Sequence, residues 1–381
     1  MVFTNNILTG RREPIGLGGL AAGFTLVEVL TALVIGSILL LGAVTIMVNS
    51  KDAYETQDDM ARLQENARFA MNLLIKDIRM AGYFGCSADA GNIYDHIDDA
   101  DAPGGLFNSG NGLEGMNNYL AGTSTWEPSA IGTPIDADVD GALGFFPGSD
   151  GITIRYLDPA TAILIDEEMP QPSAELKVSS VGNLQDGQIV AITDCNSTDI
   201  FQLTSVQTGS LHLQHNAGGS IEPGNANPGN YTFSGCNPAS CLSKSYGTDA
   251  KVMGMKAVRY YIADDDADGN PSLHRFISTP SGGGAVGSPQ KLVDGIDSLQ
   301  ITYGEDTTGN GVADTYRDSD TVVNWANVST VRIGMLLNTV DEYGQQINES
   351  AYTVNGENFA AANDRRRRRL FTTTVLLRNP Q

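Results

Sequence analysis

The sequence predicts an α+β protein in which one long N-terminal helix packs on an antiparallel β-sheet with long loops. Two patterns indicate the helix: residues 29–48 carry no charge, and apolar residues then recur at helical spacing as far as Ile78. A third pattern indicates the sheet, because short β-rich segments alternate with Gly, Asn and Asp clusters from Phe145 onward. No strand–helix–strand alternation follows Gly82, so a parallel sheet is not expected.

The first half of the predicted helix is apolar enough to cross a membrane. Residues Phe24–Val48 would form a helix about 37 Å long, because each residue adds about 1.5 Å. A bilayer core is about 30 Å thick, so this segment spans it with some tilt. No other segment of the chain is both long and apolar enough, so we expect a single span.

The second half, residues 49–82, continues the same helix as an amphipathic extension. No Pro occurs between Phe24 and Met80, so nothing interrupts the helix before it ends near Gly82. The apolar residues at helical spacing are Leu63, Ala67, Ala70, Met71, Leu74 and Ile78. This face predicts packing on the sheet. The alternative is a generic membrane anchor followed by a linker, but a linker would not carry such a stripe.

Residues 83–381 are expected to form a β-rich globular ectodomain. The predicted strands are Ile152–Leu157, Ile189–Thr193, Ile200–Val206, Leu211–Gln214, Ala257–Ile262, Ser298–Tyr303, Thr330–Asn338 and Phe371–Leu377. Residues 87–145 are interpreted as a loop-rich acidic insertion, because the chain from Met80 to Ile154 holds eleven carboxylates and no Lys or Arg.

The overall charge excludes several classes of function. The 45 acidic and 23 basic residues give a net charge of −22, which disfavours binding of nucleic acid and adsorption on anionic lipid. We also find no motif of a hydrolase, metalloprotease or nucleotide-binding enzyme, and therefore predict that the chain is not an enzyme. The Arg365–Arg369 run is read either as a solvated loop or as an ion-paired contact with an acidic neighbouring subunit.

The four cysteines indicate an oxidising compartment. Cys236 and Cys241 lie five residues apart and are close enough to bridge locally, whereas Cys86 ends the helix and Cys195 ends a predicted strand. Four cysteines allow three pairings, of which we favour Cys236–Cys241 together with Cys86–Cys195. Free thiols are the alternative.

Two acidic loops resemble the start of calcium-binding loops. The candidate ligands are Asp264, Asp266 and Asp268 in one loop, and Asp306, Thr308, Asn310 and Asp314 in the other. Neither loop has the bidentate Glu at its twelfth position, where Arg275 and Arg317 stand instead. The alternative is a pair of acidic turns. We expect no required cofactor, and calcium is the one candidate.

The residues at the head of the apolar segment carry a family resemblance. Gly23-Phe24-Thr25-Leu26-Val27-Glu28 is similar to the class III signal of type IV prepilins. The resemblance implies that a membrane-embedded aspartyl prepilin peptidase cuts between Gly23 and Phe24 and methylates the new N-terminus. Residues 1–23 would then be a cleaved leader, and Phe24–Val48 would remain as the membrane anchor and later lie in a filament core.

Glu28 is the candidate assembly residue. A carboxylate inside a membrane-spanning helix costs roughly 2.5 kcal/mol at mid-membrane and is a functional-site hypothesis by default. Cleavage creates a cationic amine at Phe24, which the Glu28 of a neighbouring subunit could neutralise, so correct axial register would be favoured. The alternative is a Glu near the helix end that reaches the lipid headgroups.

A second resemblance narrows the family. RLQENARFA at 62–70 and DIRMAGYFGC at 77–86 are similar to the PilW family of minor pilins. Further similar segments are Ala191–Cys195, Leu292–Gly304, Trp325–Val328 and Phe371–Asn379. The resemblance implies a pilin-like fold and incorporation at or near the pilus tip, which would prime assembly and support twitching motility, adhesion and DNA uptake.

The same resemblance implies the partners and the location. The partners would be other minor pilins, the major pilin, a tip adhesin, the prepilin peptidase and the inner-membrane assembly platform. The chain would be a single-pass inner-membrane protein with a periplasmic ectodomain before it enters the pilus. Two alternatives remain open at this point: a minor pseudopilin of type II secretion, and a membrane-anchored binding module or enzyme.

Overall fold

The computed structural model describes residues 23–85, 92–97, 112–120, 125–127, 144–146, 148–216, 224–225, 240–264, 270–281, 284–342 and 346–378. The chain divides into two compact units, Met1–Glu55 and Thr56–Gln381. The boundary falls within the one long helix, α1 (Leu26–Ile78), which is 53 residues long. The predicted helix is therefore confirmed, although it begins two residues after Phe24 and ends two residues before Met80.

Both ends of α1 have local causes. The Thr25 carbonyl accepts the helical hydrogen bond from Val29 N at 3.2 Å, so Thr25 is the N-cap and Phe24 stays outside the helix. After Ile78 the chain makes tighter turns, in which Met80 N bonds to Asp77 O and Ala81 N bonds to Ile78 O. Gly82 then has a φ of +70°, a conformation that glycine adopts without steric cost.

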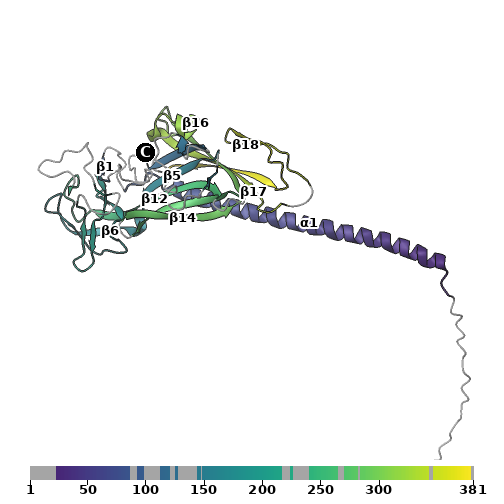
Figure 1. Ribbon diagram of the computed structural model, residues 1–381. Helices are drawn as coiled ribbons and strands as arrows, with labels where there is room; N and C mark the ends of the chain where they lie inside the picture. The colour runs from purple at the N-terminus through teal and green to yellow at the C-terminus, as the bar shows by residue number, and fades with distance from the viewer. Residues whose placement is uncertain are drawn as a thin grey trace, which may run out of the picture. The chain divides into compact units, whose positions relative to one another are not determined.

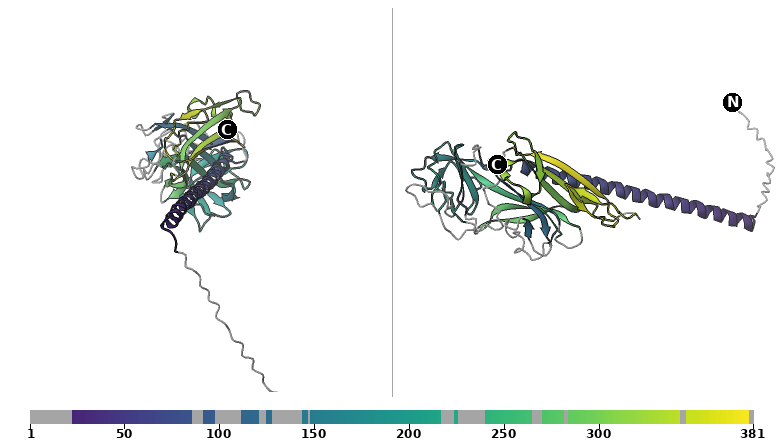
Figure 2. Two further views of the ribbon diagram at one scale, coloured as in Figure 1. Left: turned by 90° about the vertical axis from the view of Figure 1, so that its right-hand side faces the viewer. Right: turned by 90° about the horizontal axis from the view of Figure 1, so that it is seen from above.

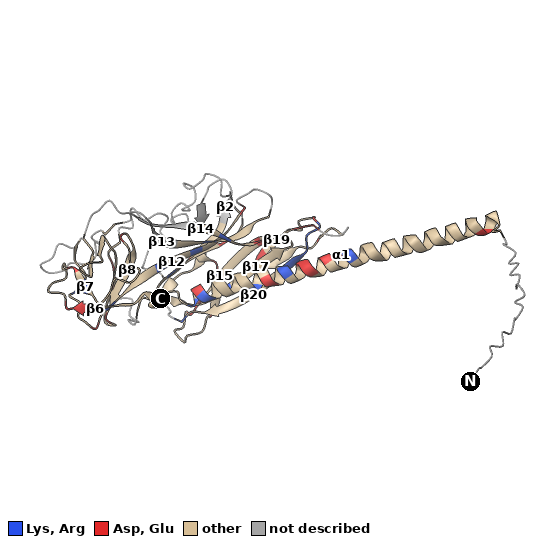
Figure 3. Cartoon of the chain, turned by 90° about the horizontal axis from the view of Figure 1, so that it is seen from below, with Lys and Arg blue, Asp and Glu red and all other residues tan. Residues whose placement is uncertain are grey.

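In the first unit the apolar part of α1 is fully exposed. Among the described residues, α1 is the one helix that is long and apolar enough to cross a membrane. Figure 3 shows the uncharged stretch between Glu28 and the first blue turn at Lys51. The sequence prediction of a single apolar anchor thus has its counterpart in the structure.

In the second unit the described strands form three sheets, the largest of which is organised around one long strand, β12 (Figure 1). This sheet contains β1 (Ile93–Asp95), β2 (Leu113–Leu120), β3 (Thr125–Glu127), β4 (Gly144–Phe145), β5 (Gly151–Leu157), β6 (Ile163–Glu167), β7 (Leu176–Val178), β8 (Ile189–Thr193), β9 (Thr198–Gln202), β10 (Ser205–Gln207), β11 (His212–Gln214), β12 (Lys251–Asp264), β13 (Ser272–Ser281) and β14 (Gly284–Asp294). β12 pairs with β4, β5, β6, β8 and β13, always antiparallel.

The second sheet has the strand order β16 (Thr315–Arg317), β15 (Ile296–Glu305), β17 (Val328–Asn338) and β20 (Arg368–Leu376). All of its pairs are antiparallel. A small hairpin joins β18 (Tyr352–Val354) to β19 (Glu357–Phe359). Three short 3₁₀ turns complete the described elements: η4 (Pro159–Thr161), η6 (Ser319–Thr321) and η7 (Trp325–Asn327).

The amphipathic end of α1 packs into the main hydrophobic core. All six residues of the predicted stripe are buried. They share one cluster with side chains of β5, β12, β15, β17 and β20, including Ile154, Tyr260, Ile301, Ile333 and Val375. The predicted packing of the helix on the sheet is confirmed, and the α+β class with it.

Every predicted strand overlaps an observed one, but only Ile189–Thr193 has the observed bounds. The predicted strand Ile200–Val206 is broken, because β9 ends at Gln202 and β10 begins at Ser205. The break falls where the chain changes its strand partner, because Leu203 N bonds to Gln188 O next to β8 whereas Thr204 N bonds to Gln214 O on β11. The parallel pairing of β1 with β9 also departs from a purely antiparallel sheet.

The sequence missed other strands for identifiable reasons. β14 contains Pro289 and two glycines, which are depleted in strands, yet it pairs along its whole length with β13. Within the predicted insertion 87–145, β2 places Leu113 and Met116 in buried positions. The described part of that segment therefore contributes to the core.

Candidate functional site

The predicted cleavage position lies immediately before α1. Gly23 and Phe24 precede the helix, Phe24 is 85% exposed, and nothing lies within 4 Å of where a Gly23 Cβ would be. The bond between them is therefore outside the helical hydrogen-bond ladder and open to approach. Because α1 begins only at Leu26, cleavage between Gly23 and Phe24 removes no helical hydrogen bond.

Glu28 and Thr25 form a capping box at the start of α1. Glu28 Oε2 accepts hydrogen bonds from Thr25 N and Thr25 Oγ1, each at 2.9 Å, and Glu28 N donates to Thr25 Oγ1 at 3.3 Å. This reciprocal arrangement fixes the carboxylate beside the first turn. Both partners lie after Gly23, so the box survives removal of the leader.

Thr25 is a residue that the functional prediction overlooked. The signal was present, because a Thr followed three residues later by Glu before an apolar run is a sequence signature of a helix N-terminus. The structure thus gives Glu28 a local partner in addition to the predicted intersubunit one. The roles of Gly23, Phe24 and Glu28 in processing and assembly stay predictions.

The second candidate calcium loop is held together by its own carboxylates. Asp306 accepts hydrogen bonds from the backbone N–H groups of residues 308 to 311, and Asp314 accepts from both Thr307 N and Thr307 Oγ1 at 2.8 Å. The Thr307 hydroxyl lowers the pKa of Asp314 below its ordinary value. The arrangement places Asp306 and Asp314 around one turn with Thr308 and Asn310.

Calcium binding stays a prediction at both loops. In the described part of the chain, no group of three or more His, Cys, Asp or Glu side chains is arranged to hold a metal ion. The oxygens of Thr308 and Asn310 fall outside that residue set. In the first loop, Asp264 ends β12, while Asp266 and Asp268 lie outside the described residues.

The cysteines that the structure describes are oxidised. Cys195 and Cys241 are both disulfide-bonded, so free thiols at these two positions are wrong. Cys86 and Cys236 lie outside the described residues. The chain just before Cys86 lies near Cys195, since Thr198 Oγ1 donates to Phe84 O at 2.9 Å. This proximity agrees with a Cys86–Cys195 bridge, and the pairing itself stays a prediction.

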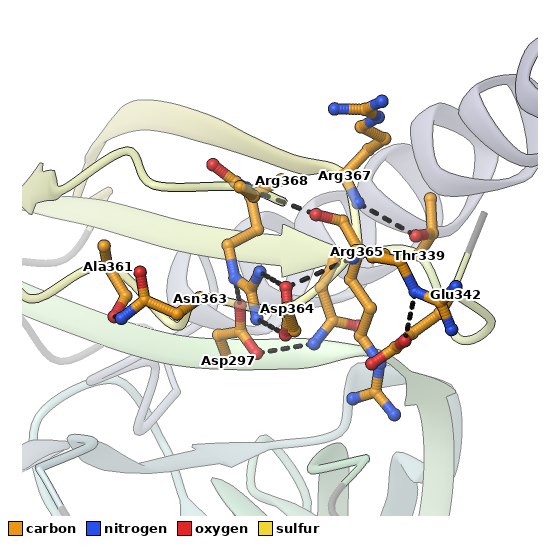
Figure 4. A network of polar contacts seen from close by, with 12 residues as sticks. Asp297, Thr339, Glu342, Ala361, Asn363, Asp364, Arg365, Arg367 and Arg368 are labelled. Carbon is orange, nitrogen blue, oxygen red and sulfur yellow. Dashed lines mark hydrogen bonds and ion pairs between the residues drawn. The ribbon is translucent and has the colours of Figure 1, made fainter. Parts of the chain in front are cut away.

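The arginine run is partly engaged in the fold (Figure 4). Arg368 donates to both carboxylate oxygens of Asp364 at 2.6 and 2.7 Å, and its Nε donates to Asp297 at 2.6 Å. Arg365 pairs with Glu342 at 2.9 Å. Hence the run is not merely a solvated loop: Arg368 joins the start of β20 to β15 and to the preceding turn.

Comparison with known families places these features in context. Residues 259–379 match the family described as Type IV Pilus-assembly protein W, and residues 20–44 match the Prokaryotic N-terminal methylation motif. The chain matches a PilW-type, prepilin-like protein. No curated protein and no solved structure matches it.

The two matches cover separate parts of the chain. The methylation motif covers the exposed Gly23–Phe24 junction, the capping box and the apolar start of α1. The family region begins within β12 and runs through β13 to β20. The motif and the single N-terminal apolar helix of the described chain support membrane anchoring and incorporation into a pilus. These families are pilus assembly components and not enzyme families.

Proposed function

We propose that this chain is a minor pilin of the type IV pilus, processed between Gly23 and Phe24 and incorporated at or near the tip to prime assembly. The observation that carries the proposal is the exposed Gly23–Phe24 junction directly before a capped helix in which Glu28 is followed by the uncharged residues 29–48. The PilW family region in the same chain favours the pilus over a type II secretion apparatus. Tip priming would support twitching motility, adhesion and DNA uptake.

The chemistry of assembly follows from charge pairing at the helix start. Cleavage makes Phe24 an N-terminal amine, which is cationic at neutral pH. Glu28 is the single charged side chain between that amine and Lys51. A buried charge is tolerated when it is paired, so a neighbour's Phe24 amine beside Glu28 makes one axial register much more favourable than others.

The remaining parts of the proposal concern place and partners. Before assembly the uncharged part of α1 would hold the chain in the inner membrane, with the β-rich unit in the periplasm. The disulfides at Cys195 and Cys241 agree with that oxidising compartment. The partners would be other minor pilins, the major pilin, a tip adhesin, the peptidase and the assembly platform.

The decisive experiment measures the mature N-terminus and filament incorporation together. Mass spectrometry of the membrane-extracted protein should find a chain that begins at N-methylated Phe24. An intact leader would exclude the pilin proposal and favour a membrane-anchored module of another class.

Two Glu28 variants separate charge from capping. Glu28→Gln keeps an oxygen that can accept from Thr25 but removes the charge, whereas Glu28→Ala removes both. We expect both variants to insert in the membrane and to be depleted from sheared pili. If Glu28→Gln is incorporated as well as wild type, charge neutralisation is not the role of Glu28.

A further inference from the structure

A groove lies between α1 and the C-terminal strand β20. Its cavity volume is about 330 Å³, and the residues that matter here are Ala67, Arg68 and Met71 on α1 and Arg369, Phe371 and Thr372 on β20. The right-hand view in Figure 2 shows the yellow strand β20 alongside the part of α1 that belongs to the second unit, and the two elements line one groove. The floor is apolar, since Ala67 and Met71 are buried and Phe371 packs against the same core.

The backbone of β20 has one unpaired edge in the described structure. β20 pairs with β17 and ends the strand order of its sheet. At either end of the pairing, Arg367 O accepts from Thr339 N and Leu377 N donates to Ser329 O, both at 2.9 Å. Because antiparallel bonding alternates, the odd-numbered residues between them face β17 with their N–H and C=O groups.

The even-numbered residues of β20 therefore direct their backbone groups outward. These are Leu370, Thr372 and Thr374, and all three are exposed. An exposed strand edge is a template for an added strand unless charge, Pro or a bulge protects it. The segment from Leu370 to Thr374 has no charge and no Pro, and its register with β17 is regular.

The charges beside this edge define what could bind there. Arg68 and Arg369 line the groove from opposite walls, both are exposed, and neither has an acidic partner among the described residues. The Arg369 guanidinium lies 5.9 Å from the centre of the Phe371 ring. Two cations without an acidic partner that line one groove, in a chain of net charge −22, favour an acidic ligand.

We infer that β20 and this groove bind an extended acidic segment of a partner pilus subunit by strand addition. The added strand would hydrogen-bond to Leu370, Thr372 and Thr374, and its groove-facing residues would alternate carboxylates for Arg68 and Arg369 with an apolar residue. A second copy of this chain is a less suitable partner for the groove. If its β20 paired with this β20, it would add two arginines and no carboxylate beside Arg68 and Arg369. The inference rests on the proposed function, since it takes the partner from the pilus.

The test uses the full-length mature protein in detergent micelles and a synthetic probe. The probe is a fluorescent heptapeptide with the sequence Thr-Glu-Thr-Val-Thr-Glu-Thr. As a β-strand it presents Glu, Val and Glu on one face and Thr on the other. Its control carries Lys in place of both Glu residues. Fluorescence anisotropy should show binding of the acidic peptide, with the Lys peptide about tenfold weaker or more.

Variants separate the charge from the strand edge. Arg68→Glu and Arg369→Glu should each weaken binding of the acidic peptide about tenfold. The control is Arg79→Glu, which changes the net charge equally but at an exposed position that does not line the groove, so it should leave binding unchanged. Thr372→Pro removes an outward N–H and no bond to β17, so it should abolish binding while leaving the thermal unfolding midpoint unchanged.

Other results would overturn the inference. They are equal binding of the two peptides, no binding of the acidic peptide at millimolar concentration, or binding that survives Thr372→Pro. Self-association of the protein alone that Thr372→Pro abolishes would assign the edge to a second copy instead. A chain that enters pili normally but binds no acidic peptide contradicts this inference alone, whereas an uncleaved leader contradicts the proposed function.

Discussion

The carboxylate of Asp77, in the last turn of α1, accepts a hydrogen bond of 2.6 Å from the hydroxyl of Tyr260 on β12. A second bond of 3.3 Å comes from Tyr156 on β5. A buried carboxylate at a helix C-terminus is unfavourable by itself, because the helix dipole is negative there. The two hydroxyls offset that cost and join the helix end to two neighbouring strands.

Tyr260→Phe should therefore destabilise the second unit. The variant keeps the ring in the core but leaves Asp77 with the longer bond to Tyr156 alone, so we expect a loss of about 2 kcal/mol in the free energy of unfolding. Urea denaturation of the full-length protein in detergent measures it. Tyr54→Phe is the matched control, because Tyr54 is 73% exposed, and equal effects of the two changes would contradict the role of Tyr260.

Arg368→Lys should also lower stability. The guanidinium binds Asp364 in a bidentate fashion and reaches Asp297 as well, and its side chain is only 7% exposed. A lysine offers a single ammonium and cannot reproduce this fork, so we expect a loss of about 2 kcal/mol. The control is Arg367→Lys in the same run, because no ion pair of Arg367 occurs among the described residues. A loss as large in the control would show that the effect is general to the run.

Asp150 should make stability fall as pH rises. Burial raises its pKa from 3.8 to about 8, although the N–H groups of Asn118 and Ile301 oppose that shift by donating to its two oxygens. The folded state thus binds a proton that the unfolded state has released, and this contribution is full below pH 3.8 and lost as pH rises to about 8.

Comparison with Asp150→Asn isolates this contribution. Within the window the wild-type slope should be steeper by up to about 1.4 kcal/mol per pH unit, because the amide does not titrate. Chemical denaturation at a series of pH values from 4 upward gives both curves. Parallel curves would show that the carboxyl group stays ionised in the folded protein.

Reduction of the disulfides should destabilise the β-rich unit. Cys195 and Cys241 are both bonded, and a native disulfide typically contributes about 2–4 kcal/mol. We expect dithiothreitol to lower the midpoint of thermal unfolding. Peptide mapping without reductant should recover Cys86–Cys195 and Cys236–Cys241, and any other pairing would contradict the prediction from the sequence.

The N-terminal features could be read from the sequence because they are local. An uncharged run, a Thr25–Glu28 spacing and an apolar stripe from Leu63 to Ile78 each depend on residues within a few helical turns. Periodicity therefore predicted α1 and its buried face, while the cleavage junction was implied by the resemblance of residues 23–28 to the prepilin signal. The error at each helix end was two residues, since capping and turn geometry decide the terminal hydrogen bonds.

The β-rich unit was predicted less completely. The β-branched strand Ile189–Thr193 was predicted with its observed bounds, whereas the Gly- and Pro-containing β14 was missed. β14 is a strand because β13 lies beside it and supplies hydrogen bonds along its length. No local preference of the β14 residues indicates that pairing, so tertiary contact overrides propensity there.

The sequence by itself determined the long helix α1, with its uncharged segment at residues 29–48 and its buried apolar stripe. Only the tertiary structure decided two other features, the partners of the arginine run and the exposed edge of β20. Arg368, for example, binds Asp297, which lies 71 residues earlier in the sequence. The physical reason is the separation in sequence between the residues that interact. Helical hydrogen bonds and caps join residues three or four positions apart, while strand pairing and ion pairs depend on where distant segments meet when the whole chain packs.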